Sequence, residues 1–131
     1  MGLHLSREQI MANKRLTCHT NTVSTGKHSV AVNVEPQPQG ALCLSFQLTG
    51  DLSQIDIPAP LPSSAADGLW EHTCFEMFVA VEGSTNYHEF NFSPSGQWAA
   101  YAFSDYRIRS AWRISQAPII RFVQTNESLL L

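Results

Sequence analysis

Residues 87–103 have the sequence YHEFNFSPSGQWAAYAF, in which two segments with apolar residues at alternate positions flank a Pro-Ser-Gly turn. Pro94 presets the backbone for a type I turn, and Gly96 can adopt the left-handed conformation that follows it. Alternation with a period of two is typical of strands that are buried on one face. The pattern therefore predicts an antiparallel hairpin with strands at 87–93 and 97–103.

The turn also predicts which side chains share a face. With Ser93 opposite Gln97, alternate residues of the two strands lie on the same side of the sheet. One side then carries the polar and aromatic residues Tyr87, Glu89, Asn91, Gln97 and Tyr101. The other side carries Phe90, Phe92, Trp98, Ala100 and Ala102, with His88, and is the expected core face. A polar-aromatic face can bind a sugar, although a solvated outer face has the same pattern.

The rest of the chain shows the same period of two. Further strands are predicted at residues 30–34, 42–48, 70–81, 119–123 and 129–131. Segment 70–81 is apolar on both faces, which favours a central strand. Residues 51–68 contain three prolines and are expected to form a long loop. The predicted fold class is all-β, an antiparallel β-sandwich.

The two ends of the chain are less regular. Residues 1–25 are expected to be weakly structured, with at most a short helix at 6–11. The chain ends inside its last predicted strand without a polar stop, which leaves open the alternative that the last strand or strands of the sandwich are missing.

Composition limits the classes of protein that fit. The 131 residues are 44% hydrophobic and 15% charged, which indicates one compact domain at 1–131. A formal charge of −3 gives no reason to expect nucleic acid or an anionic membrane as a partner. Arg7 and Glu8 interrupt the apolar stretch that a secretory signal needs, and the three cysteines form no Cys-x-x-Cys motif. We therefore expect a cytoplasmic protein.

Two segments carry a family resemblance. They are LWEHTCFEMF at residues 69–78 and YHEFNFSPSGQWAAY at residues 87–101. The chain resembles the DOMON-like superfamily over about residues 50–107, and more narrowly the bacterial DOMON-like ligand-binding domains related to type-nine carbohydrate-binding modules. The resemblance implies a β-sandwich that binds its ligand without transforming it, and so not an enzyme. Members of the superfamily bind sugars or haem b.

The resemblance also implies a set of site residues. Carbohydrate-binding relatives hold a sugar between tryptophans and fix its hydroxyls with acidic, amide and arginine side chains. Trp70 is then the first stacking ring and Trp112 the second, while Trp98 is expected in the core. The ligand-binding residues expected on this basis are Trp70, Glu76, Tyr87, Glu89, Asn91, Tyr101, Arg107 and Trp112. For Glu76 the alternative is a structural pair with Arg107 or a backbone donor.

Other functions remain open at this stage. A haem-binding domain would use Met77 with His88 or His72 as axial ligands. A zinc site would combine His72, Cys74, Glu76 and His88. Glu76 and Glu89 could form a glycosidase pair. A structural module could use an exposed edge strand for self-association or to meet a partner. The leading interpretation is a saccharide or small-molecule binding module without a cofactor.

Overall fold

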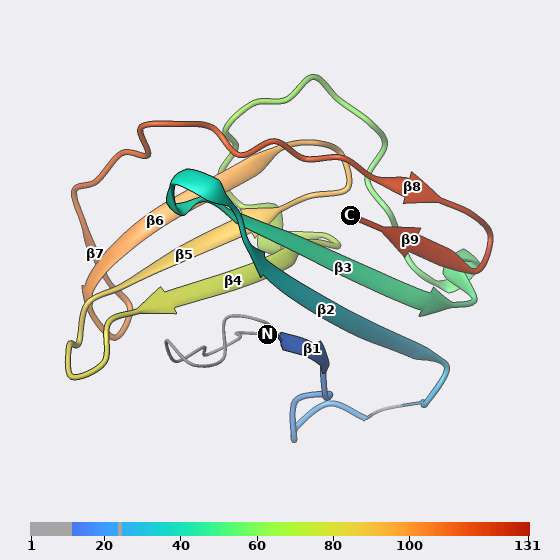
Figure 1. Ribbon diagram of the computed structural model, residues 1–131. Helices are drawn as coiled ribbons and strands as arrows, with labels where there is room; N and C mark the ends of the chain where they lie inside the picture. Colours follow the sequence, from blue (N-terminus) through green and yellow to red (C-terminus); the bar gives the residue numbers. More distant parts are fainter. Residues whose placement is uncertain (1–11, 24) are drawn as a thin grey trace. The chain divides into compact units, whose positions relative to one another are not determined.

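The computed structural model describes residues 12–23 and 25–131, which form two antiparallel β-sheets (Figure 1). No α-helix occurs in these described residues, and none of their short helical turns could cross a membrane. The predicted all-β class is confirmed, and sheets of five and four strands are consistent with a β-sandwich. The expected short helix at 6–11 lies outside the described residues.

The chain divides into two compact units, which are described separately. Of the described residues, one unit contains 57–121, and the other combines those between 12 and 56 with residues 122–131. The prediction of a single domain is not decided by this division and stays a prediction.

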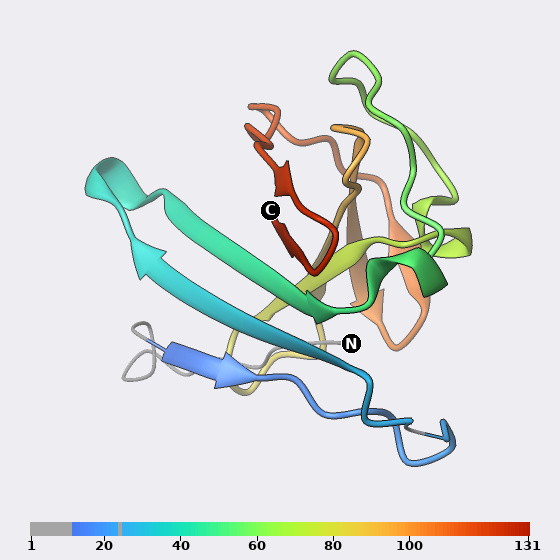
Figure 2. The ribbon, with the colours of Figure 1, turned by 90° about the vertical axis from the view of Figure 1, so that its right-hand side faces the viewer.

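The five-stranded sheet belongs to the second unit and has the strand order β1-β2-β3-β9-β8. Its strands are β1 (Ala12–Arg15), β2 (His28–Pro36), β3 (Leu42–Gly50), β8 (Val123–Gln124) and β9 (Ser128–Leu130). Figure 2 shows β2 and β3 as two long neighbouring strands, paired from His28 with Gly50 to Pro36 with Leu42. One face of this sheet is buried through the apolar residues Val32, Val34, Phe46, Leu48 and Leu129.

Two predictions for this sheet were wrong. Residues 12–15, expected to be weakly structured, form β1 and pair with residues 31–34 of β2. The strand predicted at 119–123 is reduced to β8, which begins only at Val123. Ile119 is 85% exposed, so the apolar residues before β8 do not mark a buried strand face.

The four-stranded sheet belongs to the first unit and has the order β4-β5-β6-β7. Its strands are β4 (Phe75–Ala80), β5 (Tyr87–Phe92), β6 (Trp98–Asp105) and β7 (Ile108–Ser110). The predicted hairpin register is confirmed, because Asn91 pairs with Ala99 and Glu89 pairs with Tyr101. The turn that sets this register has Gly96 at φ 91°, in the left-handed region expected for it.

The prediction that segment 70–81 is a central strand was wrong. Among the described residues, β4 stands at one end of the strand order, and its first predicted residues form a 3-10 turn, η3 (Leu69–Glu71). The segment is apolar on both sides for another reason. Phe75 and Met77 are buried on one face, while Phe78 contacts the ring of Tyr87 on the other.

Residues 51–68 form the expected long connection, with one 3-10 turn, η2 (Leu52–Gln54), near its start. Its later part is fixed to the β5–β6 hairpin by backbone hydrogen bonds. Leu61 N–H donates to the Ser95 carbonyl at 2.8 Å, and Ala66 N–H donates to the Trp98 carbonyl at 2.9 Å. This docking brings Asp67 and the η3 turn to the four-stranded sheet.

Candidate functional site

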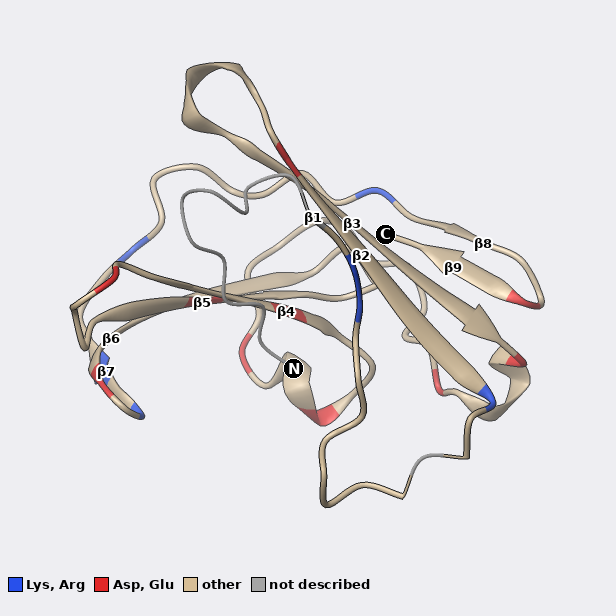
Figure 3. Ribbon diagram, turned by 60° about the horizontal axis from the view of Figure 1, so that its bottom comes forward, with Lys and Arg blue, Asp and Glu red and all other residues tan. Residues whose placement is uncertain are grey.

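One face of the four-stranded sheet gathers most of the polar and aromatic residues that the sequence singled out. The strand register places on this face Glu76 and Phe78 of β4, Tyr87, Glu89 and Asn91 of β5, Ala99, Tyr101 and Phe103 of β6, and Arg109 of β7. We call it the polar-aromatic face. Figure 3 shows acidic positions within both β4 and β5.

A continuous row of rings crosses the polar-aromatic face. Tyr87 and Phe103 stack with their centroids 4.6 Å apart and their planes 6° from parallel. Phe78 contacts Tyr87 at 6.3 Å, and Tyr101 contacts Phe103 edge-on at 6.5 Å. Trp70, in η3, ends the row with an edge contact to Tyr101 at 6.2 Å. Since Trp70 is 47% exposed, part of its ring is open to a ligand.

Tyr101 connects this row to a pair of opposite charges. Its hydroxyl donates a hydrogen bond to Asp67, and the Arg109 guanidinium carbon lies 4.0 Å from the centre of its ring. Arg109 also lies 3.8 Å from the same Asp67 carboxylate. Ion pairs this exposed contribute little to stability, so the arrangement matters mainly because it orients donors and acceptors around one ring.

The hydrogen bond changes the acidity of both partners. Accepting from Tyr101 lowers the pKa of Asp67 below its ordinary value. Desolvation, followed by the hydrogen bond to Asp67, raises the pKa of Tyr101 to about 12. At neutral pH Asp67 is therefore an ionised acceptor, and Tyr101 keeps its proton.

The acidic part of the face lies on β4 and β5. Asn91 is 0% exposed and donates through Nδ2 to Glu89 Oε1 at 3.1 Å. Desolvation raises the pKa of Glu89. The Cys74 thiol points to Glu76 Oε1 at 3.8 Å, and burial together with that carboxylate raises the thiol pKa to about 12. Cys74 is therefore protonated at neutral pH and is a poor nucleophile.

Six of the eight residues expected at the site lie on or beside the polar-aromatic face. Five of them, Glu76, Tyr87, Glu89, Asn91 and Tyr101, are on the strands, and Trp70 lies against Tyr101. Arg107 lies in the β6–β7 turn, where its guanidinium stands over the Tyr106 ring and its backbone N–H donates to the Tyr87 hydroxyl at 3.1 Å.

Trp112 is not on this face. Its ring packs edge-on against His88 at 4.7 Å and Phe90 at 6.3 Å, both of which belong to the opposite face of the sheet. The expectation that Trp70 and Trp112 hold one ligand between them was therefore wrong. Trp98 pairs with Phe92 and shares that opposite, apolar face, but it is only half-buried and not part of the core as expected.

The residues considered for zinc are divided between the two faces of the sheet, whereas Met77 and His88, considered for haem, share one face. His88 is on the opposite face from Glu76, so the four candidate zinc ligands do not converge. In the part of the chain that the structure describes, no three His, Cys, Asp or Glu side chains are grouped to hold a metal ion. Met77 is buried on the face of His88, and His72 is exposed at the end of η3.

Sequence reasoning missed Asp67 and Arg109. Asp67 belongs to the long loop and reaches the sheet only through the docking described above. Arg109 is placed by β7, a strand of three residues with no clear alternation, after a turn in which Arg107 takes φ 58°. The available signal was the Asp67-Gly68 pair, which is separated from Trp70 by one residue, Leu69.

Comparisons with known proteins identify no relative of this chain. No protein-family model matches the chain, and neither the curated proteins nor the solved structures contain a significant match. The class of protein established is therefore an all-β protein with two antiparallel sheets, one of which carries the polar-aromatic face.

Proposed function

We propose that this protein is a non-catalytic binding module for a carbohydrate or a similar small polar metabolite, held on the polar-aromatic face. The observation that carries the proposal is the half-exposed Trp70 ring beside Tyr101, with Asp67 and Arg109 at the same ring. A flat ring beside fixed donors and acceptors suits a sugar, which has C–H faces for stacking and hydroxyls for hydrogen bonds.

Each group has a specific role in this proposal. Trp70 stacks on the ligand ring, Asp67 accepts from a hydroxyl, and Arg109 donates to one. Because Tyr101 already fixes Asp67 and Arg109, little side-chain freedom is lost on binding. The resemblance to DOMON-like domains related to carbohydrate-binding modules supports the same class of ligand.

The test is a tryptophan fluorescence titration of the purified chain with a panel of mono- and disaccharides. We expect a saturable change, and binding weakened by more than about tenfold in Trp70→Ala. Trp112→Ala is the matched control, since Trp112 is 42% exposed but lies on the opposite face. Equal losses in both variants, or no response to any saccharide, would contradict the proposal.

A separate assay tests the absence of catalysis. Glu76 and Glu89 are the pair that a glycosidase would use on this face. The wild-type chain, Glu76→Ala and Glu89→Ala are assayed for hydrolysis of the same saccharides. Turnover that either substitution removes would show an enzyme rather than a binding module.

A further inference from the structure

Arg109 has hydrogen-bond donors that the described residues do not use. Its guanidinium carbon lies 4.0 Å from the centre of the Tyr101 ring, and its Nη2 lies 3.8 Å from Asp67 Oδ1. The second distance is longer than an N–H···O hydrogen bond, which measures about 3 Å. Within the part of the chain that the structure describes, the Arg109 side chain makes no hydrogen bond. Since this side chain is 51% exposed, its N–H groups are available to a ligand.

Asp67 places an acceptor next to these donors. Its carboxylate accepts a hydrogen bond from the Tyr101 hydroxyl, and its side chain is 72% exposed. Because that bond lowers the pKa of Asp67, the carboxylate is ionised at neutral pH and has no proton to donate. A carboxylate has about four lone-pair sites, so the bond from Tyr101 leaves it able to accept from a ligand. A group that only donates and a group that only accepts therefore lie side by side.

The functional groups of sugars differ in how well they match this pair. A hydroxyl both accepts and donates, so hydroxyls of one sugar can bind Arg109 and Asp67 together. A carboxylate only accepts and an ammonium only donates, so each matches one member of the pair and meets a like charge at the other. The attraction and the repulsion offset each other. A charged sugar therefore gains no net Coulomb energy to compensate for the hydration that its charge loses on binding.

We propose that Asp67 and Arg109 act as a charge-balanced pair that selects an uncharged sugar over a uronate or an amino sugar. One sugar residue can contact both side chains, because they lie 3.8 Å apart, while its ring stacks on Trp70. Specificity then comes from the competitors that the pair repels as well as from the hydroxyls that it binds. This inference rests on the proposed function and specifies the ligand of the same face.

The test is calorimetric titration of the full chain with glucose, glucuronate and glucosamine, and with the corresponding galactose series. The pH is chosen so that the uronates are ionised and the amines are protonated. We expect the neutral sugar of a series to bind at least about fivefold more tightly than its charged counterparts.

Two variants remove one charge each and should change the specificity in opposite directions. Asp67→Asn leaves Arg109 unbalanced, so the ratio of uronate to neutral-sugar affinity should rise about fivefold. Arg109→Gln leaves Asp67 unbalanced, so the ratio of amino-sugar to neutral-sugar affinity should rise by a similar factor. A general loss of structure at the site would not produce these two opposite changes.

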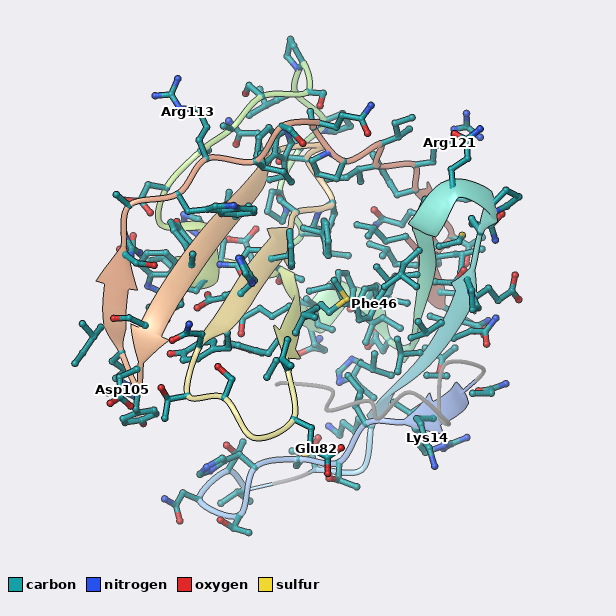
Figure 4. The ribbon with its side chains drawn as sticks, turned by 60° about the vertical axis from the view of Figure 1, so that its left-hand side comes forward. Lys14, Phe46, Glu82, Asp105, Arg113 and Arg121 are labelled. Carbon is teal, nitrogen blue, oxygen red and sulfur yellow. The ribbon has the colours of Figure 1, made fainter. Side chains whose placement is uncertain are left out.

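The matched controls are Asp105→Asn and Arg113→Gln, the same changes at two exposed positions that are not part of the polar-aromatic face (Figure 4). Asparagine at 105 keeps an acceptor for the Tyr106 backbone N–H, which donates to Asp105 Oδ1 at 2.7 Å. Both controls should leave the two affinity ratios unchanged.

The outcomes separate the two proposals. Equal affinity of the wild-type chain for neutral and charged sugars, or tighter binding of a charged one, would overturn the inference and leave a saccharide-binding module standing. Ratios that do not change in Asp67→Asn and Arg109→Gln would also overturn it. The same holds for ratios that change equally in the controls, because the effect would then come from net charge. Failure of all these sugars to bind would count against the proposed function itself.

Discussion

The hydroxyl of Tyr101 donates a hydrogen bond to the carboxylate of Asp67, a residue 34 positions earlier in the chain. The bond joins a strand of the four-stranded sheet to the long loop that precedes Trp70. Together with the backbone bond from Leu61 to Ser95, it explains how a proline-rich segment acquires a defined position. The loop thereby completes a face that the strands alone would leave without Asp67 and Trp70.

Removal of the Tyr101 hydroxyl should make Asp67 less acidic. In Tyr101→Phe we expect the pKa of Asp67 to rise toward its ordinary value, because the hydrogen bond is the largest cause of its lowered pKa. A lowered carboxyl pKa stabilises the fold above the unfolded-state pKa, and this contribution is lost as pH falls through the folded-state pKa. Carboxyl titration by NMR measures the shift. Tyr106→Phe is the control, and an Asp67 pKa that is the same in both variants would contradict the prediction.

The pKa of the Tyr101 phenol should report on the same hydrogen bond from the donor side. We expect the phenol to ionise at about 12, against about 10 for an unperturbed tyrosine. Absorbance titration of tyrosinate follows the step, and Tyr101→Phe identifies it by difference. Asp67→Asn should lower this pKa without restoring the ordinary value, because desolvation of the phenol is the larger cause. If the step removed by Tyr101→Phe lies near 10, the described contact does not persist in solution.

Glu89 should make the fold less stable as pH rises. A carboxyl whose pKa is raised on folding favours the folded state below its unfolded-state pKa, and that contribution is lost as pH rises through the folded-state pKa. Glu89→Gln removes the titration and keeps the acceptor for Asn91 Nδ2. The variant should therefore be more stable than wild type at neutral pH and similar to it in acid. Urea unfolding at both pH values tests this, and a variant less stable than wild type at neutral pH would refute it.

The sequence could predict the β5–β6 face because its turn is local. Pro94 and Gly96 fix the register, and the register alone determines that Glu89 lies opposite Tyr101. Trp112 follows β7 on a segment without periodicity, so the face that it would contact could not be deduced. The position of Arg109 could not be predicted for a related reason. The β6–β7 turn before it contains no glycine and has Arg107 at positive φ instead. The features that could be predicted depend on short-range turn chemistry. The residues that were missed depend on where the longer connections bring the chain back to the sheet.

The turn between β5 and β6 should be sensitive to loss of a single hydroxyl. Ser95 is buried, its Oγ donates to Ser93 Oγ at 2.8 Å, and it accepts from the Gln97 backbone N–H at 3.2 Å. In Ser95→Ala both partners lose a bond inside the protein, at a cost of about 1–3 kcal/mol in the free energy of unfolding. Urea denaturation measures the change, with Ser104→Ala as the control, because the hydroxyl of the exposed Ser104 makes one long bond of 3.5 Å, to the Ile108 carbonyl. Equal stability of the two variants would show that the buried serine bonds do not hold this turn.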